Sequence, residues 1–184
     1  MREIALHILD IAENSIAAGA TLIEITIEEN IENDRLTISV QDNGRGMDEQ
    51  MLAHITDPFV TSRTTRKVGL GIPLFKAAAE ASNGFLQISS TVGRGTRVEV
   101  EFQRSHLDRM PLGDLAGTML NLIVCHPDIH WLFRYRVGAQ EFTFDDDPIK
   151  IELGGIPLTE PAVLKFIKAS LKEGIDTIQQ TLAE

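Results

Sequence analysis

The order of hydrophobic and polar positions changes period several times along the chain. Apolar residues at helical spacing over residues 2–18 predict a helix with a wide core-facing stripe. Alternating apolar and polar residues predict strands at 22–29, 36–41, 85–91 and 96–102. Further helices are expected near residues 49–54 and from residues 69–71 to about residue 82. This order favours an α+β fold, with a mixed or antiparallel sheet and helices on one face.

The last eighty or so residues have a less regular pattern. A helix is expected over residues 112–124, followed by a hairpin of two strands, 131–137 and 141–145, about Gly138. A third strand is expected at 149–153, and then a helix over 160–172 that Gly174 ends. We therefore expect two units, residues 1–103 and a small α+β extension at residues 104–184.

The first predicted helix carries a stripe of polar residues. Glu3, His7, Asp10 and Asn14 recur within one narrow sector of the helix, whereas Glu13 projects to the side. On a generic helix, such a stripe is simply the face exposed to solvent. An Asn beneath an Asp on one face can also offer a carbonyl oxygen to Mg²⁺ and a carboxylate to a water molecule. Both interpretations stay open on the residues alone.

The loop at residues 42–47 follows the second predicted strand directly. Asp42 can accept a hydrogen bond from an exocyclic amine, and the missing side chains of Gly44 and Gly46 let a flat ring lie against the backbone. Ordinary Asx and glycine turn chemistry also explains these residues. The loop predicts a pocket wall only in combination with its surroundings.

A basic segment runs into the glycines at Gly69 and Gly71. The amides at a helix N-terminus are unpaired and the helix dipole favours anions there. Arg63, Arg66 and Lys67 lie just before this helix in an otherwise acidic chain. The pattern predicts a phosphate-binding site, and the alternative is that each glycine serves close helix packing.

Composition narrows the classes of function. The net charge of −10 argues against a nucleic-acid backbone as the main partner. No apolar run is long enough to cross a membrane, so no membrane partner is expected. The single cysteine, Cys125, excludes an internal disulfide framework and suits a reducing cytoplasm, where we expect the protein to be located.

Taken in order, these segments resemble the motifs of the GHKL ATPase superfamily, which is named for gyrase, a heat-shock chaperone, histidine kinases and MutL. The matching segments are residues 10–14 (N box), 42–47 (first glycine box), 57–59 (F box), 69–71 (second glycine box) and 93–96 (a distal Gly-Thr element). The resemblance covers about residues 4–102. It is closest in detail to the histidine kinase catalytic domain, with an N box that looks like that of MutL. It implies a Bergerat-type α/β sandwich.

The resemblance implies a site for ATP and Mg²⁺. Asn14 would bind the magnesium ion that bridges the phosphates, and Asp42 would accept from the adenine amino group. Gly46 would give the adenine ring room, Met47 would pack on it, and Thr96 would reach it directly or through water.

The same resemblance implies a phosphate end of the site. The amides of Gly69, Leu70 and Gly71 would hold phosphate beneath a lid at residues 61–68. Asp10 takes the place where the ATPase branches usually have a glutamate that activates water, so it is the candidate catalytic residue. Aspartate is one methylene shorter and would hold that water less well.

A second resemblance concerns His106. Residues 105–112 are similar to the phosphoacceptor box of sensor kinases, but the acid that normally follows the histidine comes one place late, at Asp108. The segment also lies after the predicted ATP-binding unit and lacks two long helices. A coincidence in a linker is the favoured explanation, and phosphorylation of His106 is the alternative.

Three functional classes remain open. The first is a slow regulatory ATPase, and the second is a kinase that transfers phosphate to a partner protein of unknown identity. The third is a non-catalytic module that holds a protein partner in an ATP-dependent state. ATP binding is common to all three, and the oligomeric state is left open.

Overall fold

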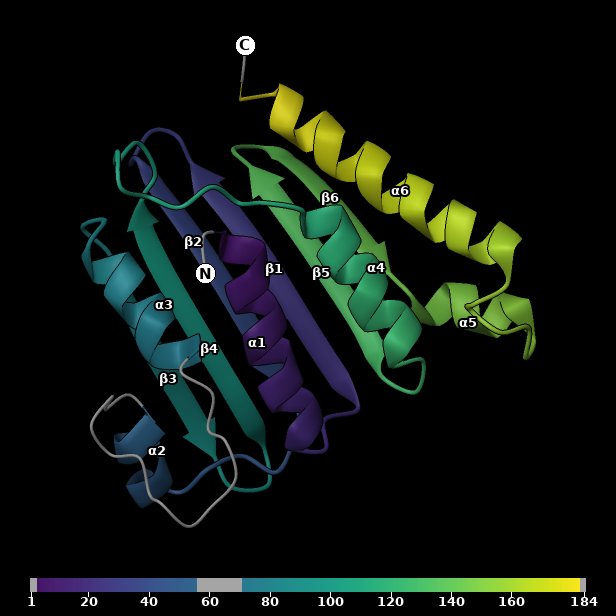
Figure 1. Ribbon diagram of the computed structural model, residues 1–184, viewed down its shortest axis with the longest axis horizontal. Helices are drawn as coiled ribbons and strands as arrows, with labels where there is room; N and C mark the ends of the chain where they lie inside the picture. The colour runs from purple at the N-terminus through teal and green to yellow at the C-terminus, as the bar shows by residue number, and fades with distance from the viewer. Residues whose placement is uncertain (1–2, 56–70, 183–184) are drawn as a thin grey trace.

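The computed structural model describes residues 3–55 and 71–182 of the 184-residue chain. It contains one six-stranded sheet in the order β3-β4-β2-β1-β5-β6. The strands are β1 (Leu22–Asn30), β2 (Arg35–Asp42), β3 (Phe85–Thr91), β4 (Gly95–Gln103), β5 (His130–Val137) and β6 (Gln140–Asp145). The helices α1, α3, α4 and α6 lie on one face of the sheet (Figure 1). The predicted α+β class, with a mixed sheet covered on one face, is confirmed.

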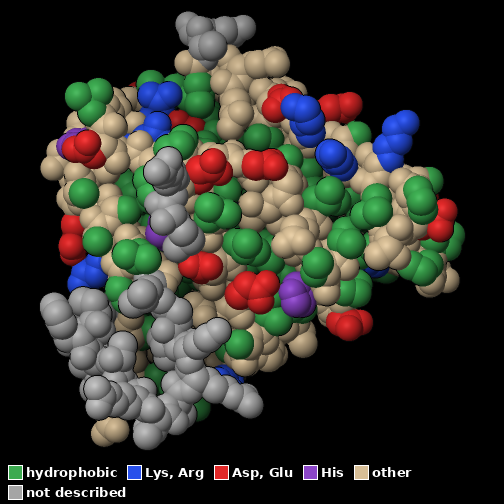
Figure 2. All heavy atoms as spheres, in the orientation of Figure 1, with side chains coloured by type: hydrophobic (Ala, Val, Ile, Leu, Met, Phe, Trp, Pro, Cys, Tyr) green, Lys and Arg blue, Asp and Glu red, His purple; other side chains and the backbone are tan. Residues whose placement is uncertain are grey.

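The helices follow the apolar spacing of the sequence. Their bounds are α1 (Ile4–Ala17), α2 (Glu49–Ile55), α3 (Gly71–Glu80), α4 (Leu115–Cys125), α5 (Asp147–Leu153) and α6 (Pro161–Gln180). None of the helices in the described part of the chain has the length and hydropathy needed to cross a bilayer. Acidic side chains are spread across the described part of the helix-covered face, in keeping with the net charge (Figure 2).

One face of the sheet is buried beneath the helices, and the other is exposed to solvent. Ile23, Ile25 and Ile27 alternate along β1 and are fully buried beneath the helices. On the opposite face, Arg134 pairs with Glu24 across β5 and β1 at 2.9 Å. Such exposed pairs contribute little to stability, so the packing of the helix-covered face holds the fold together.

Strand β1 joins the two parts of the chain into one sheet. It pairs antiparallel with β2 and parallel with β5, so that Ile25 lies between Val40 and Phe133. The other strand pairs are antiparallel. The C-terminal segment therefore extends the sheet of the N-terminal segment rather than packing on it through side chains alone.

The segment after β4 holds the start of α1. The amides of Ile4 and Ala5 donate to the carbonyl oxygens of Pro111 and Leu112, at 3.0 and 2.9 Å. The first amides of a helix lack partners within the helix, and these carbonyls supply them. At the other end of α1, Gly19 has φ +77°, as expected for the residue that follows a helix.

The strand predicted at residues 149–153 is wrong, because this segment forms α5. Ile149, Ile151 and Leu153 alternate, which imitates a strand. In the structure Ile149 and Leu153, one turn apart, pack against the core, while Ile151 is 74% exposed. Pro148 at the first turn and the left-handed Gly154 at the end favour a helix.

The predicted helix end at Gly174 is also wrong. Helix α6 continues through this glycine to Gln180. A Cβ built on Gly174 would lie 2.1 Å from the ring of Phe142 on β6. The glycine therefore lets α6 approach the sheet closely, and this packing offsets its cost of about 1 kcal/mol within a helix.

Candidate functional site

Asp42 is buried at the end of β2, and its carboxylate is held by three donors. Its Oδ2 accepts from the Ser15 hydroxyl at 2.7 Å. Its Oδ1 accepts from the amide of Gly44 at 2.8 Å and from that of Thr96 at 3.3 Å. A carboxylate offers about four lone-pair positions, so these donors leave one on Oδ2 for a ligand N–H.

The loop after Asp42 is fastened to the rest of the fold at both ends. The Asn43 side chain accepts from the amides of Thr21 and Leu22, at 2.8 and 2.9 Å. Gly46 has φ +67°, and a Cβ there would lie 2.0 Å from the carbonyl oxygen of Thr91. Gly46 is thus required by a close approach of two backbones, which fixes the loop against the turn between β3 and β4.

The Ser90 hydroxyl links Met47 of the loop to Thr96 of β4. The Ser90 hydroxyl accepts from the Met47 amide at 2.8 Å and donates to the carbonyl of Gly95 at 3.0 Å. The Thr96 hydroxyl lies 2.9 Å from that of Ser90. Either hydroxyl can donate to the other; with the Ser90 proton on the Gly95 carbonyl, Thr96 would donate to Ser90 and keep its own lone pairs for a ligand or a water molecule.

A cavity of about 270 Å³ adjoins these groups. Its lining includes Asp42, Ser90 and Thr96, and also Gln41, Ser89 and Arg97, which alternate with them along the strands and are exposed. The cavity therefore reaches the exposed face of the sheet, and Met47 is not among the residues that line it. Asp42, Ser90 and Thr96 nevertheless bring polar groups together at one end of the sheet, as is typical of a small-molecule site.

The polar stripe of α1 faces α3 at one end and solvent at the other. A Cβ on Gly71 would lie 2.6 Å from Oδ2 of Asp10, so this carboxylate rests against the start of α3. Asn14, one turn later, is exposed. The structure therefore brings Asp10 to the beginning of the helix that the second glycine motif opens, and the stripe is more than a solvated face.

His7, one turn before Asp10, is buried and stacks on Phe75 of α3, with ring centroids 4.5 Å apart. Burial lowers the pKa of His7, and the nearby Asp10 carboxylate and a backbone hydrogen bond at Gly71 partly offset this effect. The neutral imidazole is thus a packing element between α1 and α3.

Several predicted site residues lie outside the described residues. These are Arg63, Lys67, Gly69 and Leu70, with the lid at 61–68 and the F box at 57–59. Of the predicted phosphate end, the structure describes Asp10, Asn14 and Gly71.

His106 lies far from Asp42. It follows Ser105, whose hydroxyl donates to Asp34 in the turn between β1 and β2, at the opposite end of β2 from Asp42 (Figure 1). Its Nδ1 accepts from the amide of Asp108 at 3.1 Å. The structure does not bring His106 together with the Asp42 pocket.

The sequence prediction missed the residues that hold the site. Ser15 and Ser90 anchor Asp42 and Thr96, and Asn43 anchors the loop. Ser15 carried a signal, because it lies one turn after Ile11 on the apolar stripe of α1, where a polar residue needs a buried partner. Ser90 carried no comparable signal.

Comparison with known proteins places these features in a family. The family model described as histidine kinase-, DNA gyrase B- and HSP90-like ATPase matches residues 2–106, which is more than half of the chain. Sporulation kinase D of Bacillus subtilis is 36% identical over 93 residues, which is 50% of this chain and 18% of that kinase. The sensor protein kinase FleS of Pseudomonas aeruginosa is 42% identical over 89 residues, which is 48% of this chain and 22% of FleS. The chain thus spans less than a quarter of the length of these relatives.

A solved structure shares the fold over a longer stretch. The crystal structure of the N-terminal domain of a DNA repair protein matches with a TM-score of 0.55 and 13% identity, over 78% of this chain and 52% of that one. Residues 2–106 are a smaller share of the chain than this, so the likeness in fold extends into the C-terminal segment.

Proposed function

The chain belongs to the family of histidine kinase-, DNA gyrase B- and HSP90-like ATPases, and on that premise we propose that residues 1–103 bind ATP with Mg²⁺. The adenine would lie at Asp42 and the phosphates toward Asn14 and Gly71. One observation carries the proposal. The buried carboxylate of Asp42 is fixed by three donors and keeps one acceptor position for a ligand N–H.

The residues present fit adenine in particular. The adenine amino group is a donor, which matches the open acceptor position on Asp42. The Thr96 hydroxyl supplies a second polar group from β4, and Met47 adds an apolar surface on the loop side. Guanine presents a carbonyl oxygen at the corresponding ring position, which a carboxylate repels.

The phosphate end rests on the N box. Asn14 would hold the magnesium ion, which when bound neutralises charge on the phosphates. Gly71, and with it Gly69 and Leu70, would offer amides to phosphate at the start of α3, and Arg63 and Lys67 would add positive charge. Asp10 rests against Gly71, so a phosphate held there would lie beside this carboxylate, which would orient a water molecule.

For the reaction, we propose slow hydrolysis or phosphoryl transfer to a partner protein. The relatives named sporulation kinase D and sensor protein kinase FleS support a regulatory kinase-like role. The presence of Asp10 in place of a glutamate supports the second candidate, an ATP-dependent interaction module without chemistry. A cytoplasmic location is part of the proposal and rests on the single cysteine.

Direct titration tests the binding proposal. Isothermal titration calorimetry should show saturable binding of Mg-ATP and at least about tenfold weaker binding of Mg-GTP. The variant Asp42→Asn should lose about tenfold or more in ATP affinity, because an amide nitrogen or an amide oxygen replaces a charged acceptor. Asp128→Asn, an equivalent change at an exposed loop position, should bind like the wild type. Unchanged ATP affinity in Asp42→Asn would overturn the assignment.

A further inference from the structure

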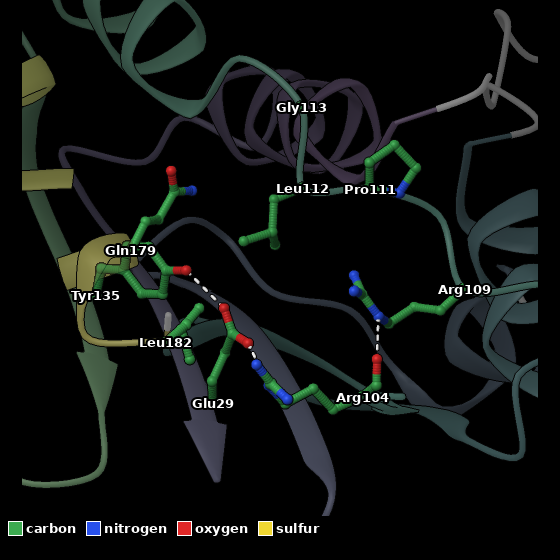
Figure 3. A pocket seen from close by; sticks show the side chains of 9 residues that line it. All are labelled: Glu29, Arg104, Arg109, Pro111, Leu112, Gly113, Tyr135, Gln179 and Leu182. Carbon is green, nitrogen blue, oxygen red and sulfur yellow. Dashed lines mark hydrogen bonds and ion pairs between the residues drawn. The ribbon is translucent and has the colours of Figure 1, made fainter. Parts of the chain in front are cut away.

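A second cavity, of about 320 Å³, lies at the far end of the sheet from Asp42. It lies where the end of β1, the segment after β4, β5 and α6 meet (Figure 3). Glu29 of β1 lines it, and β1 places Ile23 beside Asp42. Six residues of strand separate the two positions by about 20 Å, so this cavity is distinct from the proposed ATP site.

Glu29 lines the cavity, and each of its carboxylate oxygens has a partner. It is 4% exposed, and the Tyr135 hydroxyl donates to its Oε1 at 2.6 Å. Arg104 donates to its Oε2 at 2.7 Å and balances its charge. Burial and the Glu29 carboxylate raise the pKa of Tyr135, so the phenol remains a donor. The charge of Glu29 is therefore balanced by Arg104, and a cationic ligand finds no unbalanced carboxylate among the described residues that line the cavity.

Arg109 supplies positive charge that is not balanced in the described part of the chain. Its Nε donates to the carbonyl of Arg104 at 2.5 Å, and its Nη1 donates to that of Met110 at 2.9 Å. These two bonds to backbone fix the guanidinium, and Figure 3 shows it directed into the cavity. Within the described residues, no acceptor pairs with Nη2 of Arg109. The guanidinium is therefore held in place and has unused N–H donors for a ligand in the cavity.

The walls beside Arg109 are apolar. Leu112 and Leu182 line the cavity from the segment after β4 and from the turn after α6, with Pro111 beside them. One unbalanced guanidinium next to apolar walls matches a monoanion with an apolar body better than a strongly hydrated dianion. We propose that this cavity is a binding site for a small organic monocarboxylate, whose carboxylate pairs with Arg109 and whose hydrocarbon part packs on Leu112.

Binding of a ligand in this cavity should be detectable at the start of α1. The carbonyls of Pro111 and Leu112 accept from the amides of Ile4 and Ala5 at the start of α1. A ligand that packs on these two residues therefore changes the environment of the two amides. This assignment does not depend on ATP binding, because none of these groups belongs to the Asp42 pocket.

Titration of the full chain followed by amide nuclear magnetic resonance tests the site. The probes are hexanoate, its neutral match hexanamide, and inorganic phosphate. Hexanoate should give saturable shifts at the amides of Ile4, Ala5 and Tyr135. Hexanamide and phosphate should bind at least about tenfold more weakly. Absence of saturable hexanoate binding, equal binding of hexanamide, or tighter binding of phosphate would each overturn the proposal.

Two variants test separately the contribution of the Arg109 charge and that of the apolar lining to ligand binding. Arg109→Gln should lower hexanoate affinity about tenfold or more, whereas Arg136→Gln, on the other face of the sheet, should leave it unchanged. Leu182→Ala removes apolar wall near the end of the chain. It should weaken hexanoate severalfold and leave the binding of acetate, which lacks the hydrocarbon tail, unchanged. Thermal unfolding checks that each variant is folded. Wild-type hexanoate affinity in a folded Arg109→Gln would contradict the site.

Discussion

Asp42 is a buried carboxylate that keeps an open acceptor position, and this combination is the observation on which the proposed ligand site rests. Burying a carboxylate is costly unless donors surround it. Ser15, Gly44 and Thr96 supply donors from α1, the loop and β4. Three separate elements thus converge on one side chain, which explains why the sequence around Asp42 alone could not distinguish a pocket wall from a turn.

His7 gives a prediction for the pH dependence of stability. Burial holds its pKa in the folded state below the ordinary value of 6.5, so the unfolded chain binds more protons between these two values. Stability is therefore fully present above pH 6.5 and falls as the pH drops below it. The variant His7→Phe keeps a ring for Phe75 and removes this titration.

Urea unfolding at about pH 7.5 and about pH 5.5 measures the effect. The wild type should lose more unfolding free energy between the two values than His7→Phe does, because only the wild type must keep a histidine neutral. Equal losses in the two proteins would show that His7 does not cause acid sensitivity.

Among the secondary-structure elements, those with long and regular periods were predicted well, and those that depend on tertiary contacts were not. The helix α1 and strands β1 to β4 follow apolar spacing. Helix α5 was predicted as a strand because its three alternating apolar residues match the period of a strand. The structure shows a helix that leaves one of them, Ile151, exposed to solvent, which only the tertiary packing determines. Gly174 was predicted to end α6. The helix continues because the glycine packs against the ring of Phe142, which belongs to β6 and is distant in the sequence.

The loop at residues 42–47 gives a prediction at this scale. Gly46 and Gly93 both have left-handed backbones, with φ +67° and +76°. Gly93 faces open space, whereas a Cβ at Gly46 would clash with the Thr91 backbone. Gly93→Ala should therefore cost roughly 1–2 kcal/mol of unfolding free energy, the cost of the backbone conformation alone.

Gly46→Ala should cost at least about 2 kcal/mol more than Gly93→Ala, because the two backbones must also move apart. Urea unfolding of the two variants compares them directly. ATP affinity should fall in Gly46→Ala alone. Equal destabilisation of the two variants would mean that the loop tolerates separation from β3.

For the whole molecule, β5 places the C-terminal segment beside residues 1–103 in one sheet. Neither the sequence period nor the spacing of motifs predicted that β5 would pair parallel with β1, because such a pair depends on a long crossover connection. The family match ends at residue 106, and the likeness in fold continues beyond it. We propose that nucleotide-dependent changes reach the C-terminal segment through this shared sheet.

The fate of phosphate separates the proposed reactions of the whole protein. Asp10→Asn should abolish the release of phosphate to water, weaken transfer to a co-incubated partner, and leave ATP binding intact, since the proposed role of Asp10 is to orient water rather than to bind adenine. Glu13→Gln on the same helix projects away from Asn14 and serves as the matched control. Released phosphate and labelled protein are measured with γ-labelled ATP. Wild-type phosphate release by Asp10→Asn would remove Asp10 from the mechanism.

The proposed ATP site depends above all on a contact between Asp42 and the adenine amino group. The most direct test is a cycle of four affinities, for ATP and for purine riboside triphosphate, which lacks this amino group, with the wild type and with Asp42→Asn. Loss of the amino group should cost the wild type about 1.5–3 kcal/mol of binding free energy and should cost Asp42→Asn much less. An equal loss in both proteins would contradict the contact between Asp42 and adenine.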